Sequence, residues 1–256
     1  MSAKFVDSKI LQRPLRMEAP AELGKNSVAM AIEAIDAGKL EEAKQLIRYF
    51  VPEGKGLHDL YCDWSYGWYE YVAKKYGEEA LLEASRETQE PWLKGFCEVL
   101  MAMDDVYERV AWLAECMRAH RCGPQQMGDV TVIEEADRYV MEFDPCGSGG
   151  RMRRGDPVNG TPARTGPPYD FGCFKQGYPW TWGEKIPYYC VHCCVNQIRA
   201  IELAGYPLWI TEYSPDANAP CKWIVYKSPE LIPEKYWTCV NKTKPASFPD
   251  VKKSSA

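Results

Sequence analysis

The densest group of reactive side chains lies in the run Cys-Val-His-Cys-Cys at positions 190–194, which holds three thiols and one imidazole. Cys190 and Cys193 are two residues apart, so one turn of chain can bring both sulfurs to one ion. Thiolate and imidazole suit Zn²⁺, which takes about four such ligands in a tetrahedron. The alternative is that these cysteines are small buried apolar residues. We predict a zinc site with the candidate ligands His192, Cys193, Cys194, Cys221 and Cys190.

A glycine-rich turn follows Cys146 and leads into three arginines, Arg151, Arg153 and Arg154. Successive backbone N–H groups in such turns bind anions, and arginine recognises carboxylate or phosphate through two parallel hydrogen bonds. No Gly-Lys-Ser/Thr follows, so the segment is not a nucleotide-type phosphate loop. The arginines are candidate substrate-binding residues, and Cys146 is a candidate catalytic residue. The alternative is a surface loop with solvated arginines.

Two further groups could line a pocket. His58 and Cys62 are four residues apart, as are Asp59 and Asp63, so each pair shares a helix face and a carboxylate could orient the imidazole for acid–base work. His58 is therefore a candidate catalytic residue, whereas His120, near a predicted helix end, is expected to be structural. Trp180, in an aromatic loop over 177–183, is a candidate substrate-binding residue, although that loop could equally cover the sheet.

The segments Pro-Leu-Trp-Ile-Thr-Glu-Tyr at 207–213 and Cys-Lys-Trp-Ile-Val-Tyr-Lys at 221–227 resemble the end of the vinyl-4-reductase-like domain. That domain is similar in layout to the 2-aminothiazoline-4-carboxylate hydrolase group. The resemblance covers about 130–227 without the long loop. It implies a zinc site formed by a helix-opening cysteine (Cys193 or Cys194), Glu212 and Cys221. The further cysteine of that pattern is missing here, where Ser214 and Pro215 stand, and Cys146, Cys190 or His192 could take its place as the fourth ligand.

The composition is that of a globular protein: 256 residues, 46% hydrophobic and 26% charged, with a net charge of −5. The acidic balance argues against non-specific nucleic-acid binding, which needs a basic face. Short, interrupted apolar runs predict no membrane span, and residues 1–17 lack the apolar core of a secretory signal. An odd count of eleven cysteines is unlike a closed disulfide framework and favours a reducing compartment. We therefore predict a cytoplasmic protein.

Hydrophobic periodicity predicts an α+β fold. A helical region is expected over 1–125, and a small antiparallel or mixed sheet plus a helix over 126–256. The two regions could also form one compact unit. Ser27 is the predicted cap of the first helix, and Pro52 the predicted end of the second. The expected helices are 27–37, 40–51, 57–76, 78–87, 91–118 and 190–204. The expected strands are 130–133, 139–143, 207–213 and 221–226.

These patterns predict a zinc-dependent hydrolase or lyase acting on a small carboxylate-bearing molecule, with Glu212 or His58 moving protons. One alternative is a sensor or carrier domain that binds a small molecule and has a structural zinc site. Another is a metal-free enzyme in which the arginines near Cys146 lower the pKa of its thiol. The expected partner is a small anionic ligand, with no nucleic acid and no membrane, and with a homodimer as an option.

Overall fold

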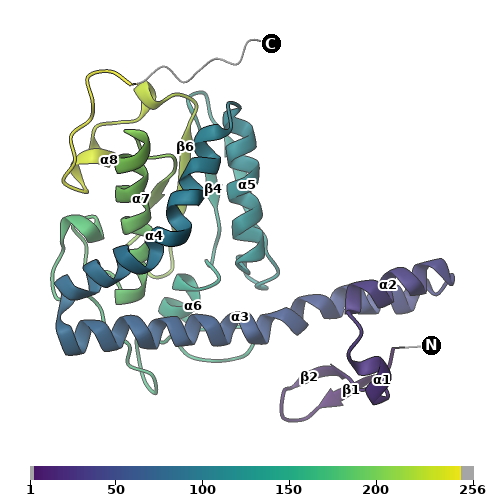
Figure 1. The fold of residues 1–256 in the computed structure, drawn as a ribbon. Helices are drawn as coiled ribbons and strands as arrows, with labels where there is room; N and C mark the ends of the chain where they lie inside the picture. The colour runs from purple at the N-terminus through teal and green to yellow at the C-terminus, as the bar shows by residue number, and fades with distance from the viewer. Residues whose placement is uncertain (1–2, 249–256) are drawn as a thin grey trace. The chain divides into compact units, whose positions relative to one another are not determined.

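The computed structural model describes residues 3–248 (Figure 1). The chain forms two compact units, Met1–Tyr61 and Cys62–Ala256, and the predicted boundary near residue 125 falls inside the second. Helix α3, Leu40–Tyr76, begins in the first unit and ends in the second. None of the helices within the described residues is long and apolar enough to cross a membrane.

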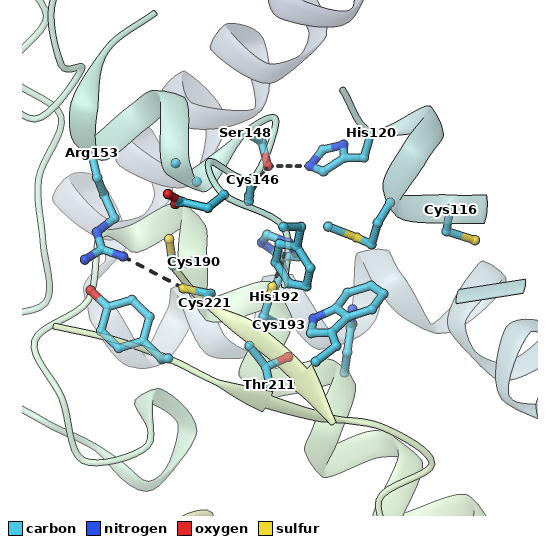
Figure 2. Close-up of a pocket in the computed structure, with 18 of the residues that line it drawn as sticks. Cys116, His120, Cys146, Ser148, Arg153, Cys190, His192, Cys193, Thr211 and Cys221 are labelled. Atoms are coloured by element: carbon cyan, nitrogen blue, oxygen red, sulfur yellow. Dashed lines mark hydrogen bonds between the residues drawn. The ribbon is translucent and has the colours of Figure 1, made fainter. Parts of the chain in front are cut away.

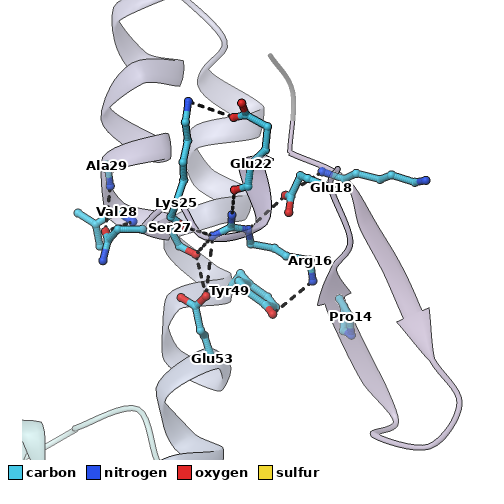
Figure 3. Close-up of polar contacts among 12 residues, drawn as sticks. Pro14, Arg16, Glu18, Glu22, Lys25, Ser27, Val28, Ala29, Tyr49 and Glu53 are labelled. Carbon is cyan, nitrogen blue, oxygen red and sulfur yellow. Dashed lines mark hydrogen bonds and ion pairs between the residues drawn. The ribbon is translucent and has the colours of Figure 1, made fainter. Parts of the chain in front are cut away.

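The N-terminal unit is organised around the buried guanidinium of Arg16 (Figure 3). Its elements are the antiparallel strands β1 (Phe5–Ser8) and β2 (Arg13–Arg16), the helices α1 (Pro20–Leu23) and α2 (Ser27–Asp36), and the first part of α3. Arg16 donates to the Ser27 hydroxyl at 2.6 Å and to Glu18 at 3.2 Å. A buried cation needs such partners because desolvation is costly.

The predicted Ser27 cap is wrong by one residue. Asn26 caps α2, because its side-chain oxygen accepts from the backbone N–H groups of Val28 and Ala29 at 2.9 and 3.1 Å. Ser27 is instead buried against Arg16, which a sequence pattern does not reveal.

Two predicted breaks at proline are also wrong. Pro52 lies inside α3, and Pro91 lies inside α4, Glu78–Ala102. An internal proline removes one helical hydrogen bond and costs about 3 kcal/mol. Burial of a continuous face offsets that cost in α4, where buried positions recur at helical spacing on both sides of Pro91: Leu81, Ser85, Gln89, Leu93, Cys97 and Leu100. Helix α5, Val106–Ala119, is separate.

The C-terminal unit contains a four-stranded antiparallel sheet in the order β3-β4-β6-β5. The strands are β3 (Thr131–Glu134), β4 (Arg138–Glu142), β5 (Ile210–Glu212) and β6 (Lys222–Tyr226). Helix α7, Val191–Ala204, contacts both α4 and β5, and α5 contacts β6. A core that includes Leu93, Leu113 and Trp209 joins these helices to the sheet. The predicted α+β class is confirmed.

Short elements fill the connections of this unit. They are α6 (Gly149–Arg154), α8 (Lys235–Thr238) and three single 3₁₀ turns, η1 (Pro179–Thr181), η2 (Tyr188–Cys190) and η3 (Pro229–Leu231). The long segment between α6 and α7 is anchored by polar contacts to the end of α3, since Arg164 donates to Asp63 at 3.2 Å and the Gly172 N–H donates to Glu70 at 2.7 Å.

Candidate functional site

A cavity of about 400 Å³ lies within the C-terminal unit (Figure 2). Its walls come from α4, the end of α5, the turn into α6, the start of α7 and the sheet. Aromatic side chains make much of the lining, among them Trp92, Phe96, Trp182, Trp209, Tyr213 and Trp223. Concave, largely apolar sites with a few polar groups are typical of small-molecule binding.

Close backbone packing places Cys146 beside the end of α5. A Cβ on Gly147 would lie 1.6 Å from the carbonyl oxygen of His120, so only glycine allows this approach. A Cβ on Gly150 would likewise lie 2.6 Å from the Pro145 side chain. The glycines of this turn therefore serve close packing, and the packing brings Cys146 and His120 to the same wall of the pocket.

His120, Ser148 and Cys146 form a hydrogen-bonded group in that wall (Figure 2). The His120 Nε2 lies 2.7 Å from the Ser148 hydroxyl, which lies 3.7 Å from the Cys146 sulfur. Burial alone would raise the pKa of Cys146, but the hydrogen bond and charge of His120 and the N–H groups of Gly150 and Ser148 outweigh it and lower that pKa to about 6. Cys146 is therefore a thiolate at neutral pH.

The other cysteines that line the pocket show the opposite shift. Burial raises the pKa of each of these four thiols above its ordinary value: Cys116, Cys190, Cys193 and Cys221. Neighbouring thiols add to the effect at Cys190, Cys193 and Cys221. They remain protonated at neutral pH, so Cys146 is the ionised thiol among the cysteines that line this cavity.

His192 is neutral. Burial lowers its pKa to about 4, although the bond to the Tyr189 carbonyl opposes the shift. Its Nδ1 lies 2.6 Å from that carbonyl oxygen and must donate to it, so Nε2 is an acceptor. The Cys193 sulfur lies 3.2 Å from Nε2, where its thiol proton can be donated. His192 and Cys193 thus form a closed neutral pair.

The predicted zinc ligands are partly brought together. Cys190, His192, Cys193 and Cys221 line the cavity, whereas Cys194 is buried in the core with its sulfur 3.7 Å from the Pro179 carbonyl oxygen. Within residues 3–248, no group of three or more His, Cys, Asp or Glu side chains is arranged to hold a metal ion. Both ring nitrogens of His192 are also engaged. The zinc site stays a prediction.

The three candidate arginines have different surroundings. Arg151 is 1% exposed and pairs with Asp63 at 2.8 Å, outside the pocket lining. Arg154 lines the pocket but is held by Asp144. Arg153 also lines it, donates to the Ser214 carbonyl at 2.7 Å and lies over the Tyr213 ring. Among the described residues, no carboxylate pairs with Arg153. It is the arginine best placed to bind an anion.

The remaining candidates lie outside the pocket lining. Glu212 ends β5 and accepts from the Tyr236 hydroxyl at 2.8 Å. Trp180 stacks on Tyr178, with ring centroids 4.5 Å apart. His58 belongs to the N-terminal unit, where its Nδ1 lies 3.1 Å from Asp59.

Sequence reasoning missed His120, Ser148 and three polar residues of the pocket floor, Asn196, Trp209 and Thr211. Ser148 directly follows Cys146-Gly147, so the turn itself was a signal. His120 is 28 residues from its partner Ser148, and no spacing rule connects them. Its expected structural role is incomplete, because its side chain contacts the reactive thiol.

Comparison with protein-family models, with curated proteins and with solved structures finds no significant match to this chain. The resemblance to the vinyl-4-reductase-like domain therefore stays a prediction. The order of elements it rests on is present, since α7 is followed by β5, which ends at Glu212, and Cys221 directly precedes β6. Glu212 and Cys221 do not share the pocket lining, however.

The pH dependence of alkylation tests the ionised state of Cys146. The modification rate of this residue by iodoacetamide should be half-maximal near pH 6, because its pKa is lowered to about 6 and the thiolate is the reactive form above that value. Replacing His120→Gln should move the midpoint upward by about one pH unit or more, since the positive partner is lost. Mass spectrometry of the Cys146 peptide gives the rate.

Cys173 serves as the internal control in the same digest. It is an exposed residue, and partial desolvation of its sulfur raises the pKa of its thiol. If the Cys146 midpoint coincides with that of Cys173 in the wild-type protein, the thiolate assignment is wrong.

Proposed function

We propose that this protein is a thiol-dependent hydrolase that acts on a small carboxylate-bearing molecule. The observation that carries the proposal is the hydrogen-bonded group of Cys146, His120 and Ser148 in the wall of an aromatic cavity. A thiol with a lowered pKa beside an imidazole is the arrangement that nucleophilic catalysis requires. Residues with strongly shifted pKa values are also found most often in functional sites, within clefts.

The residues present account for both halves of the reaction. The Cys146 thiolate attacks the acyl carbon, and a C–S bond forms as the bond to the leaving group breaks. Protonated His120 gives its proton to that leaving group. Neutral His120 then takes a proton from water, whose oxygen attacks the thioester, so that the acid is released and the Cys146 thiolate and protonated His120 are restored.

The surroundings of the thiolate indicate the class of substrate. Arg153 supplies a guanidinium without a carboxylate partner among the described residues, which suits a substrate carboxylate. The aromatic walls suit an apolar or planar portion. A volume of about 400 Å³ is at the small end of the range for ligand pockets and limits the substrate to a small molecule.

Two alternatives have support of their own. The predominantly aromatic lining favours a sensor or carrier domain that binds a ligand without turning it over. The gathering of Cys190, His192, Cys193 and Cys221 in one cavity favours the zinc-dependent hydrolase or lyase, once a rearrangement of these side chains is allowed.

Acylation by an activated ester tests the nucleophile. Mono-4-nitrophenyl glutarate should release a burst of nitrophenolate and leave a glutaryl adduct on Cys146, because its carboxylate suits Arg153 and its ester suits the thiolate. Cys146→Ala should abolish the adduct, and His120→Gln should slow hydrolysis of the adduct by about 100-fold, because His120 is the base that takes a proton from water. Cys116→Ala removes a protonated thiol of the same pocket and should leave the burst unchanged. An undiminished burst from Cys146→Ala protein would contradict the proposal.

The charge on Arg153 should matter for anionic substrates alone. Arg153→Met should weaken binding of mono-4-nitrophenyl glutarate by about 10-fold or more, as expected for a lost charge-assisted hydrogen bond. Acylation by neutral 4-nitrophenyl butyrate should be unaffected. The comparison is of the ester concentration at half-maximal acylation rate. Equal losses for both esters would show that Arg153 supports the fold of the site rather than the substrate.

Metal removal separates the thiol mechanism from the zinc alternative. Dialysis against a chelator should leave the alkylation midpoint and the nitrophenolate burst unchanged, because His120 and backbone N–H groups stabilise the thiolate. Elemental analysis of the purified protein provides the second measurement. About one tightly held zinc per chain, with loss of the burst on its removal, would favour the zinc-dependent enzyme instead.

A further inference from the structure

Three buried polar atoms in the floor of the pocket have no hydrogen-bond partner: Asn196 Oδ1, Trp209 Nε1 and Thr211 Oγ1. Their residues are 7%, 2% and 5% exposed, and all three line the cavity that holds Cys146. Buried polar groups are paired in the great majority of cases, because an unpaired one loses its bonds to water without replacement. Three such atoms in one wall indicate partners supplied by a bound molecule.

The neighbouring side chain of Gln197 contrasts with the pocket floor. Gln197, the residue after Asn196, is fully satisfied within the protein. Its oxygen accepts from Trp182 Nε1 and the Thr211 N–H, each at 3.3 Å, and its nitrogen donates to the Tyr236 carbonyl at 3.0 Å. The fold thus pairs the amide of Gln197 and leaves the amide oxygen of Asn196, a residue of the cavity lining, without a partner.

The three atoms specify a hydrogen-bonding pattern. Asn196 Oδ1 can only accept, Trp209 Nε1 can only donate, and the Thr211 hydroxyl can do either. A carboxamide presents the complementary pair, an N–H donor beside a carbonyl acceptor. A carboxylate could accept from Trp209 and Thr211 but has no proton to donate to Asn196 Oδ1, so the matching group must carry a donor beside its acceptor. Figure 2 shows Thr211 and Arg153 on different sides of the pocket, which separates this floor from the guanidinium.

We infer that the pocket floor formed by Asn196, Trp209 and Thr211 binds a neutral carboxamide group of the ligand, whose N–H bonds to Asn196 and whose carbonyl accepts from Trp209 and Thr211. This inference deepens the proposed function and rests on it for the role of Arg153, which takes the carboxylate. The substrate class is then an N-acylated amino acid or a similar amide-bearing carboxylate.

A pair of isosteric probes tests the floor without catalysis. In hippurate, an N–H separates the carbonyl from the CH₂ that bears the carboxylate; in 4-oxo-4-phenylbutanoate, a CH₂ replaces that N–H. Calorimetric titration of the Cys146→Ala protein should show hippurate binding about 3- to 10-fold more tightly, the range for one neutral hydrogen bond. Asn196→Leu in that background should remove the difference between the probes, because it removes the acceptor.

Further variants divide the roles. Trp209→Phe should weaken both probes by a similar factor, since both retain the carbonyl. Trp180→Phe is the matched control: its indole N–H also lacks a partner but lies outside the pocket, so neither affinity should change. If Asn196→Leu fails to fold, the test still stands, because the comparison of the two probes uses the Cys146→Ala protein and needs no variant of the pocket floor.

The outcomes separate this inference from the proposed function. Equal affinity of the two probes, as expected if the floor binds only ordered water, overturns the inference, and so does the absence of binding by either. Neither result bears on whether Cys146 is acylated by an activated ester, which is the test of the hydrolase. Conversely, discrimination between the probes without acylation would support the floor and favour a binding protein.

Discussion

The candidate site depends on one steric constraint, the contact between the backbone at Gly147 and the carbonyl of His120. A side chain at position 147 would overlap that oxygen at 1.6 Å, so the end of α5 and the turn before α6 can meet only through glycine. The meeting places an imidazole, a hydroxyl and a thiol in one hydrogen-bonded group. Without it, Cys146 would be another buried thiol with a raised pKa, like those around it.

Electrostatics then differentiates cysteines that the sequence presents as equivalent. Composition and spacing treat Cys146, Cys190, Cys193 and Cys221 as one set of soft ligands. In the folded protein, burial acts on all of them. Cys221 accepts a hydrogen bond from Arg153 at 3.8 Å, yet its pKa stays raised, and among these four only at Cys146 do hydrogen bonds and charge outweigh burial. The pKa values diverge in opposite directions, which yields a single nucleophile inside a protonated, weakly polar wall. The protonated thiols of that wall are only weakly polar, which suits a cavity lined by aromatic side chains.

The parts of the fold that were predictable are those that local patterns govern. Hydrophobic periodicity predicted the α+β class, helix α7 and the four strands of the sheet, because periodicity reflects which face is buried. It failed at Pro52 and Pro91, where tertiary packing of a continuous helix face outweighs a local penalty. It also placed the cap at Ser27 rather than Asn26, because Arg16, distant in sequence, engages the serine hydroxyl.

The candidate site likewise contains residues that local patterns indicate and residues that they do not. Local motifs singled out Cys146, Arg153 and the thiol-rich start of α7. In the structure Cys146, Arg153, Cys190, His192 and Cys193 line one cavity, whereas Cys194 does not. The motifs could not distinguish Arg153 from Arg151, because that depends on Asp63 reaching the latter from α3. Nor could they find the floor, since Asn196 and Thr211 are ordinary residues for a helix and a strand. What marks them is the absence of a partner for a buried atom, and that property exists only once the surrounding chain has folded around it.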